Sequence, residues 1–339
     1  MIKKILIVVL VFINIGVIIK ADEGIYVDAS SAILIEKDTK RIMYEKNINE
    51  RFLTASIAKI LTAITVIENT DLEKWALVEK DTISQVGSSI YLELGDKVKV
   101  VDLLYGMLLR SGNDAAYLLA KTTSGNIDQF VYLMNETAKK IGMTSSTFSN
   151  PSGLDEEDTN YSTAYDMAIL MAYALNNETF KEITSSKSYT SKTFNGNLLY
   201  FVNKHKLVLN LDYVTGGKTG YTKRAKRTLV TSAYKNGMEL ICVTFNCGDD
   251  WNVHNKLFDY GFNNFEMKTI ARRQIIDLEG LDYNEIPYLP IDLKYPIKEN
   301  ENVKCIMYLL KNPKDEIIGK ASLIIDNIEV YKSNIYRYS

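Results

Sequence analysis

The sequence is poor in histidine, cysteine and proline. Its 339 residues include two histidines, three cysteines and five prolines. With only His205 and His254, the chain cannot form a histidine-rich metal centre, and a histidine-based catalytic triad is disfavoured. The cysteines, at positions 242, 247 and 305, have no metal-ligand spacing, and their odd number fits poorly with a disulfide framework. We therefore expect neither a bound metal nor a cofactor.

A strong net charge is also lacking. The 40 lysines and arginines nearly balance 42 aspartates and glutamates, which gives a formal net charge of −2. Because phosphate binding needs a basic face, nucleic acid is not an expected partner. The 46% of hydrophobic residues and 24% of charged residues are typical of a globular protein. The length predicts two domains, or one large domain with an appendage.

The N-terminus has the pattern of an export signal. Lys3 and Lys4 precede an apolar run over residues 5–19, which is shorter than the roughly 20 residues that a membrane span needs. This pattern predicts a signal peptide over residues 1–21 and an extracytoplasmic location in the cell envelope. The alternative is an uncleaved N-terminal anchor, which would associate the protein with the membrane.

Hydrophobic periodicity predicts strands at both ends of a helical block. Residues 31–44 and 229–246 are typical of antiparallel hairpins. Apolar residues recur at helical spacing between them, over residues 54–69, 101–122 with a break at 111–113, 130–141 and 163–175. From residue 267 onward the helical spacing disappears and short alternating runs follow. We therefore expect an α+β fold: a catalytic domain over 22–266, with an antiparallel sheet packed by helices, and a small β-rich C-terminal domain over 267–339.

Three short motifs stand in order along the chain. They are Ser56-Ile57-Ala58-Lys59, Ser111-Gly112-Asn113 and Lys218-Thr219-Gly220. Each is weak alone, because the chain contains a second S-x-x-K at 232–235 and a second S-G-N at 124–126. Context separates them: Ser56 is placed in the first turn of a helix, where residues three apart share a face, whereas Ser232 ends a strand.

Ser56 and Lys59 can act as nucleophile and base. A serine hydroxyl needs a group that takes its proton, and a lysine one turn away reaches it. The lysine must be neutral, and lowering its pKa from ~10.4 to ~7 requires roughly 4–5 kcal/mol of differential interaction. Burial and a second cation, Lys218, supply that shift. Taken singly, the first two motifs more often mark a helix start and a helix–helix turn, and the third can be a simple turn. A phosphate loop ending at Lys218 is excluded because Asp212 stands where that loop needs glycine.

Together the three motifs resemble those of the serine penicillin-recognising enzymes. Within that group the chain is similar to the low-molecular-weight D-alanyl-D-alanine carboxypeptidases, from about residue 29 to 262. The resemblance implies a β-lactamase/transpeptidase-like catalytic domain. It also implies a serine D,D-carboxypeptidase that removes the terminal D-alanine from peptidoglycan stem pentapeptides. β-Lactams are then expected to be covalent inhibitors that acylate Ser56.

The resemblance also implies a role for each motif residue. Ser56 is the expected nucleophile, Lys59 its general base, and Ser111 the group that passes a proton to the leaving D-alanine. Substrate-binding residues are expected at Asn113, which holds the substrate amide, and along the third motif. There Lys218 and Thr219 of Lys218-Thr219-Gly220 bind the terminal carboxylate. The backbone N–H groups of Ser56 and Tyr221 form the expected oxyanion hole.

Other functions stay open at this point. A D,D-endopeptidase that cuts peptidoglycan crosslinks would use the same residues. A β-lactamase is less favoured, since its best-known class has S-D-N and a separate glutamate. A catalytically dead wall-binding protein is the alternative outside enzymes. It stays open because Lys226 stands where the family usually has glycine, either narrowing the cleft or lying in a solvated loop.

Overall fold

The computed structural model describes residues 8–13, 25–155, 159–278, 283–311 and 313–338. The chain divides into two compact units. The larger is Ile25–Lys235 with Glu239–Gly261, and the smaller is Phe262–Ser339 with Asn236–Met238 and Met1–Gly24. The expected α+β fold with a β-rich C-terminal region is confirmed. The residue limits given above for the domains stay a prediction.

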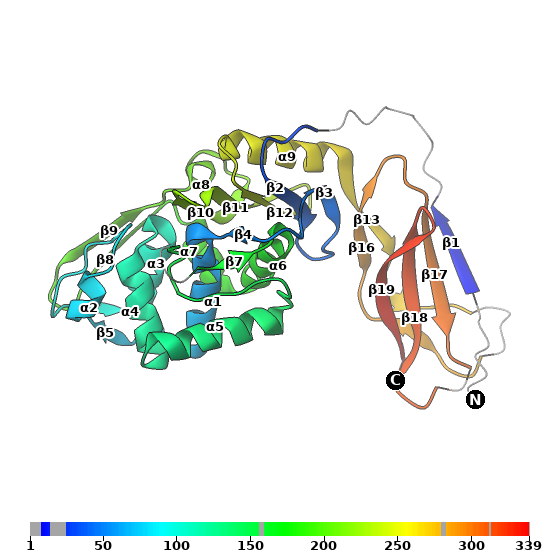
Figure 1. The fold of residues 1–339 in the computed structure, drawn as a ribbon. Helices are drawn as coiled ribbons and strands as arrows, with labels where there is room; N and C mark the ends of the chain where they lie inside the picture. The colour runs from blue at the N-terminus through cyan, green and yellow to red at the C-terminus, as the bar shows by residue number, and fades with distance from the viewer. Residues whose placement is uncertain (1–7, 14–24, 156–158, 279–282, 312, 339) are drawn as a thin grey trace. The chain divides into compact units, whose positions relative to one another are not determined.

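An antiparallel five-stranded sheet forms one layer of the larger unit (Figure 1). Its order is β10-β11-β12-β2-β3, with the bounds Val214–Thr222, Lys226–Lys235, Met238–Phe245, Ser31–Glu36 and Ile42–Lys46. Every residue of β2 is buried and the strand is apolar over residues 32–35, whereas the edge strand β3 has exposed and buried positions. Because β2 pairs with β12, the start of the unit is joined to its end, which brings distant motifs to one sheet.

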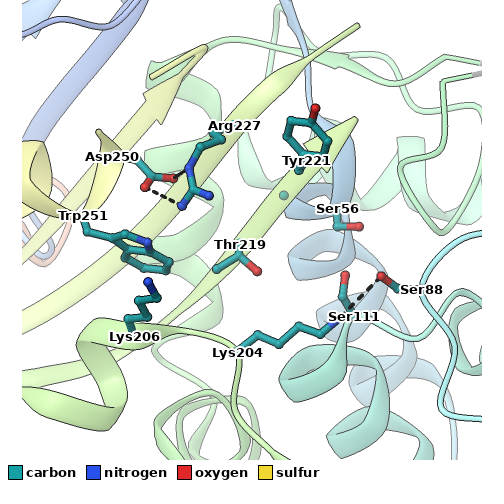
Figure 2. A pocket seen from close by; sticks show the side chains of 11 residues that line it. Ser56, Ser88, Ser111, Lys204, Lys206, Thr219, Tyr221, Arg227, Asp250 and Trp251 are labelled. Atoms are coloured by element: carbon teal, nitrogen blue, oxygen red, sulfur yellow. Dashed lines mark hydrogen bonds and ion pairs between the residues drawn. The ribbon is translucent and has the colours of Figure 1, made fainter. Parts of the chain in front are cut away.

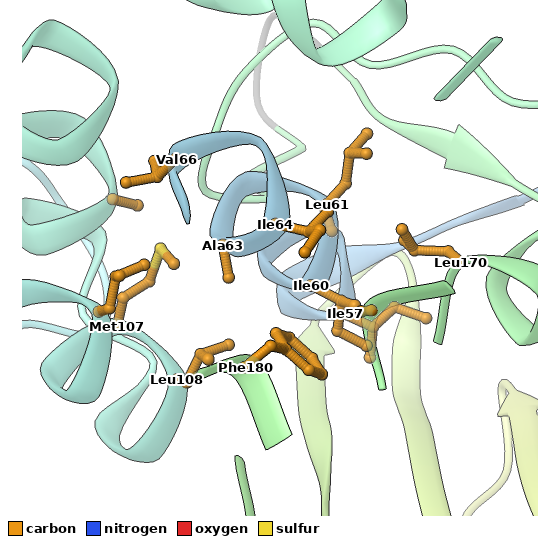
Figure 3. Close-up of a cluster of buried hydrophobic side chains, with 14 of the residues drawn as sticks. Ile57, Ile60, Leu61, Ala63, Ile64, Val66, Met107, Leu108, Leu170 and Phe180 are labelled. Carbon is orange, nitrogen blue, oxygen red and sulfur yellow. The ribbon is translucent and has the colours of Figure 1, made fainter. Parts of the chain in front are cut away.

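The helices of the larger unit surround one central helix, α1 (Lys59–Asn69). It contacts α3, α4, α5, α6 and α7, whose bounds are Val100–Arg110, Asn113–Ser124, Ile127–Ile141, Ala164–Ala174 and Glu178–Ser185. Figure 3 shows the apolar side chains of α1 enclosed by Met107, Leu108, Leu170 and Phe180. Burying each large apolar side chain contributes roughly 1.5–3 kcal/mol, so the position of α1 is firmly held.

Short elements and the longer helix α9, most of which belongs to this unit, complete it. They are β4 (Phe52–Leu53), η1 (Ala55–Ala58), β5 (Trp75–Leu77), α2 (Lys80–Ile83), β6 (Lys97–Lys99), β7 (Tyr161–Ser162), β8 (Ser188–Lys192), β9 (Leu198–Val202), α8 (Lys206–Asn210) and α9 (Asp250–Asn264). The expected break at 111–113 is where α3 ends and α4 begins. No helix among the described residues has the length and apolar character needed to cross a membrane.

The smaller unit is built on a six-stranded sheet. Its order is β1-β17-β18-β19-β15-β14, with the bounds Val8–Ile13, Val303–Leu309, Ile317–Ile325, Ile328–Arg337, Pro287–Leu289 and Gln274–Ile275. A second pair, β13 (Phe265–Ala271) and β16 (Leu293–Lys298), packs into the same core. Apart from β1, the expected signal peptide over 1–21 lies outside the described residues, and it stays a prediction.

The loop between β10 and β11 gives a backbone reason for the glycine that the resemblance leads us to expect at position 226. Thr222 pairs with Lys226, so three residues form the loop, and Lys226 has a φ of 59°. A three-residue hairpin loop places its following residue in the left-handed region, which a side chain disfavours. Lys226 is exposed and lies outside the cleft described below. Residue 226 is therefore constrained by its backbone conformation and not by the space in the cleft, which supports the solvated-loop interpretation.

We expect Lys226→Gly to stabilise the protein. Removing the side chain relieves left-handed strain, so the free energy of unfolding should rise by about 0.5–1 kcal/mol, net of the extra chain entropy. Thermal unfolding measures the change. Lys223→Gly, in the same loop but without a positive φ, is the control and should be neutral or destabilising. Equal effects at both positions would contradict the strain explanation.

Candidate active site

Ser56 lies in a 3₁₀ turn that leads directly into α1. The expectation of an ordinary first helical turn was wrong in this detail: η1 covers Ala55–Ala58, and α1 begins at Lys59. In a 3₁₀ turn residues i and i+3 eclipse one another, so Ser56 and Lys59 still share a side. The Lys59 Nζ atom lies 3.1 Å from Ser56 Oγ.

The turn is held by close backbone contacts. Ala55 has a φ of 47°, in the left-handed region. Gly153 (φ 82°) packs against it so closely that a Cβ there would lie 1.9 Å from the Ala55 carbonyl oxygen. On the other side the Thr228 hydroxyl donates to the Thr54 carbonyl at 3.0 Å. Only glycine fits at 153, so this residue fixes the position of the Ser56 turn.

The Lys59 amine is fully buried and has three partners. Its Nζ lies 2.7 Å from Asn113 Oδ1 and 3.1 Å from Ser56 Oγ, and it also donates to the Ser152 carbonyl. A neutral amine has two hydrogens and one lone pair. Asn113 Oδ1 and the Ser152 carbonyl only accept, so they take the two hydrogens, and the lone pair is left for the Ser56 hydroxyl. The geometry fits a neutral amine that receives the serine proton.

The electrostatic surroundings favour the same protonation state. Burial is the largest cause that holds the pKa of Lys59 well below its usual value, and the charge of Lys218 adds to it. Lys204 lowers the pKa of Lys59 further, whereas Asp114 opposes the shift. The pKa of Lys218 is itself lowered to about 7, first by burial and then by Lys204.

Ser111 and Asn113 follow the end of α3. Ser111 is in the left-handed region, with a φ of 65°, and it lines the same cleft as Ser56. Asn113 is buried, and its amide is committed on both sides: Oδ1 accepts from Lys59, and Nδ2 donates to the Val86 carbonyl at 2.7 Å. The structure thus gives Asn113 a contact with the lysine amine. Its expected contact with substrate stays a prediction.

Strand β10 carries the third motif past the Ser56 turn. Thr219, Gly220 and Tyr221 line the cleft, whereas Lys218 is buried and donates to the Thr219 carbonyl at 2.8 Å. A Cβ on Gly220 would lie 2.9 Å from the Ser56 backbone nitrogen and 2.3 Å from Thr228 Oγ1. Glycine at this position therefore lets the strand approach the backbone of the serine.

A cleft of about 420 Å³ joins these residues (Figure 2). Sequence reasoning had assigned Ser56, Ser111, Thr219, Gly220 and Tyr221 to the site, and all five line the cleft. It did not assign six others that also line it: Ser88, Lys204, Lys206, Arg227, Asp250 and Trp251. The available signals were Gly87-Ser88-Ser89 and the basic run 223–227, but neither has a motif spacing that indicates a role. The decoys Ser124 and Ser232 do not line this cleft.

The wall of the cleft is positively charged. Lys204, Lys206 and Arg227 line it, and of the described lining residues only Asp250 is acidic. Arg227 and Asp250 form a two-point ion pair, with N–O distances of 2.7 and 3.0 Å. The guanidinium of Arg227 also stacks over the Trp251 ring at 5.6 Å. Such a wall favours a ligand that carries a carboxylate.

The chain is similar in sequence to one family of known proteins. The model of the D-alanyl-D-alanine carboxypeptidase family, Peptidase S11, matches residues 18–248. D-alanyl-D-alanine carboxypeptidase DacF of Bacillus subtilis is 36% identical over 73% of this chain and 65% of its own length. The chain thus spans slightly less than two thirds of this relative.

Two solved structures are similar to this chain in fold. A Streptomyces K15 DD-transpeptidase is 28% identical, with a TM-score of 0.66, and covers 71% of this chain and all of its own. The D-alanyl-D-alanine carboxypeptidase DacD of Francisella tularensis has a TM-score of 0.75 over 96% of both chains. Its sequence identity is 23%, so it shows the fold, including the C-terminal region.

The charge of Lys218 predicts a shift in the pH dependence of the site. Below pH 7 Lys218 is protonated and lowers the pKa of Lys59. Replacing it in Lys218→Gln should raise the pKa of Lys59, so acylation of Ser56 by a fluorescent penicillin should reach half its maximal rate at a higher pH. Lys187→Gln, at a largely exposed lysine, should leave the midpoint in place. A midpoint that stays fixed or falls in Lys218→Gln would show that Lys218 does not act on Lys59.

Proposed function

Because the chain belongs to the D-alanyl-D-alanine carboxypeptidase family of serine peptidases, we propose that it removes the terminal D-alanine from peptidoglycan stem pentapeptides. The observation that carries the proposal is the Lys59 amine, buried and hydrogen-bonded to Ser56 Oγ, with its two other partners both acceptors. This arrangement gives a nucleophile with its own base and needs no histidine.

The proposed reaction has two stages. Ser56 Oγ attacks the carbonyl carbon of the penultimate D-alanine while its proton passes to Lys59. The peptide C–N bond then breaks, and the leaving D-alanine nitrogen receives a proton by way of Ser111, which lines the same cleft. Water next attacks the acyl-enzyme, and the shortened peptide leaves with a new carboxylate while Ser56 regains its proton. β-Lactams enter the first stage and acylate Ser56.

The backbone N–H groups of Ser56 and Tyr221 are proposed to stabilise the oxyanion. The support is the close approach of β10 to the serine turn at Gly220, where any larger residue would meet the Ser56 nitrogen. Two backbone donors fixed in this way need no reorganisation when the carbonyl oxygen becomes charged.

The terminal carboxylate is proposed to bind at Thr219, which lines the cleft together with Lys204 and Lys206. Lys218, expected to share this role, is buried, and a pKa of about 7 leaves it only partly charged at neutral pH. Lys204 and Lys206 line the cleft itself and supply charge for the carboxylate, whereas the charge of Arg227 is balanced by Asp250. The charge favours a substrate with a carboxylate beside the scissile bond, and the family match favours a carboxypeptidase over a D,D-endopeptidase. A β-lactamase is not favoured, given the S-G-N motif and the family.

The location is proposed from the substrate. Peptidoglycan stem peptides lie outside the cytoplasmic membrane, so we place the protein at the cell envelope, exported by residues 1–21. Attachment through an uncleaved N-terminal segment is the alternative to release after cleavage.

Two substitutions test the nucleophile and its base. Ser56→Ala should abolish both D-alanine release and covalent penicillin labelling, because it removes the attacking oxygen. Lys59→Arg replaces the neutral amine with a guanidinium that stays charged and cannot take the serine proton, so acylation should fall by at least about 100-fold. Mass spectrometry with penicillin and with a D-Ala-D-Ala peptide locates the adduct and counts the alanine released.

Ser124→Ala, in the decoy S-G-N, is the matched control and should behave as the wild type. Labelling that persists in Ser56→Ala would show that another residue is the nucleophile. A labelled wild-type protein that releases no D-alanine would instead contradict the proposed substrate.

A further inference from the structure

The two histidines form a buried hydrogen-bonded chain behind the cleft. His205 Nε2 lies 3.0 Å from Thr231 Oγ1, and His254 Nδ1 lies 2.9 Å from the same oxygen. His254 Nε2 lies 3.0 Å from Thr244 Oγ1. All four side chains are buried, with exposures of 0–1%. We call this set, His205, Thr231, His254 and Thr244, the histidine–threonine relay.

The partners of the relay determine where its protons lie. His205 Nδ1 accepts from the Val208 backbone N–H at the start of α8, so the ring proton is on Nε2. It is donated to Thr231 Oγ1, with the Val230 carbonyl also 3.3 Å away. The single hydroxyl proton of Thr231 is then free for His254 Nδ1. His254 in turn carries its proton on Nε2 and donates it to Thr244. The hydrogen bonds of the relay therefore all run in one direction, with each group donating to the next from His205 to Thr244.

The relay ends at the segment that supplies the cationic wall. His205 stands between Lys204 and Lys206, which both line the cleft. A Cβ on Gly217 would lie 2.6 Å from His205 Nε2, so the ring is packed against the backbone of β10 immediately before Lys218. The backbone N–H of Lys204 donates to the Leu109 carbonyl near the end of α3.

The His205 ring also packs against Trp251, which belongs to the part of the wall that contains Arg227. The rings of His205 and Trp251 meet edge to face, with their centroids 5.1 Å apart. Trp251 carries the guanidinium of Arg227 on its face. Of the cations that line the described cleft, Lys204 and Lys206 are thus next to His205 in the chain, and Arg227 is linked to it through Trp251.

We propose that His205, held by the histidine–threonine relay, is a positioning residue that sets the cationic wall for the carboxylate of the substrate. The inference rests on the proposed function. His205 does not line the cleft, so it acts through Lys204, Lys206, Trp251 and Arg227. Its loss should affect substrate binding and leave the chemistry at Ser56 largely intact.

The first test measures the protonation of the two imidazole rings in the relay. The chain has only two histidines, so a long-range ¹H–¹⁵N NMR spectrum contains only two imidazoles. Both should be neutral rings with the proton on Nε2. Neither should titrate between pH 8 and pH 5, in line with burial, which lowers the pKa of His205 to about 3. A proton on Nδ1 of either ring, or a charged ring at pH 6, would overturn the relay.

The second test separates positioning from general stability. Thr231→Val removes the shared hydroxyl at constant shape. It should raise KM for a D-Ala-D-Ala peptide by about tenfold while kcat changes by less than about twofold. For the same peptide with an amidated C-terminus, KM should be the same in Thr231→Val and in the wild type, because this peptide has no carboxylate to position. Thr231→Ser keeps the hydroxyl and should restore the wild-type KM.

Thr65→Val is the control for loss of a buried threonine hydroxyl. The Thr65 hydroxyl is buried without a hydrogen-bond partner among the described residues, so this variant should match the wild type. If Thr231→Val does not fold, Thr244→Val breaks the same chain at its far end and should also raise KM alone. An unchanged KM, or a fall confined to kcat, would overturn the positioning role. If the wild-type protein releases no D-alanine, the proposed function is contradicted. The NMR spectrum would still show whether the relay exists.

Discussion

The burial of one lysine amine is the constraint on which the site depends. A charged amine taken out of water is costly, and Lys59 is fully buried inside the helical block. The amine avoids that cost by staying neutral, and its partners suit the neutral form: two acceptors for its hydrogens and one hydroxyl for its lone pair. The reactivity of Ser56 therefore follows from the packing of α1, because moving the helix toward solvent would let the lysine take up a proton.

Distant parts of the chain meet around the Ser56 turn because the larger unit joins its ends. Strand β2 pairs with β12, and β10 lies beyond β11 in the same sheet. This order places β10 beside the turn that begins α1. The approach is close enough that Gly153 and Gly220 cannot be replaced without backbone movement. Two glycines outside the S-x-x-K motif thus fix the geometry of the motif.

Sequence reasoning found the centre of the site and missed its walls, for a physical reason. Ser56 and Lys59 are three residues apart, so local backbone geometry alone brings them together, and the 3₁₀ turn in place of an α-turn changes little. Lys206, Arg227 and Trp251 come together only through strand pairing and the packing of α8 and α9, which no local spacing reveals. The scarcity of histidine argued against a histidine base, and neither ring lines the cleft. It gave no hint that both rings are joined through Thr231, since that contact spans two separate elements and the strand between them.

The same positive charges serve two steps that place opposite demands on Lys59. In the free protein Lys218 and Lys204 hold its pKa down, which keeps the base ready to accept a proton. A carboxylate bound at the cationic wall offsets part of that charge, so the proton affinity of Lys59 rises once substrate is in place. The base is then neutral before binding and stronger at the moment of attack. An uncharged ligand produces no such change, so the proposed preference for a free carboxyl end would lie in the chemical step as well as in binding.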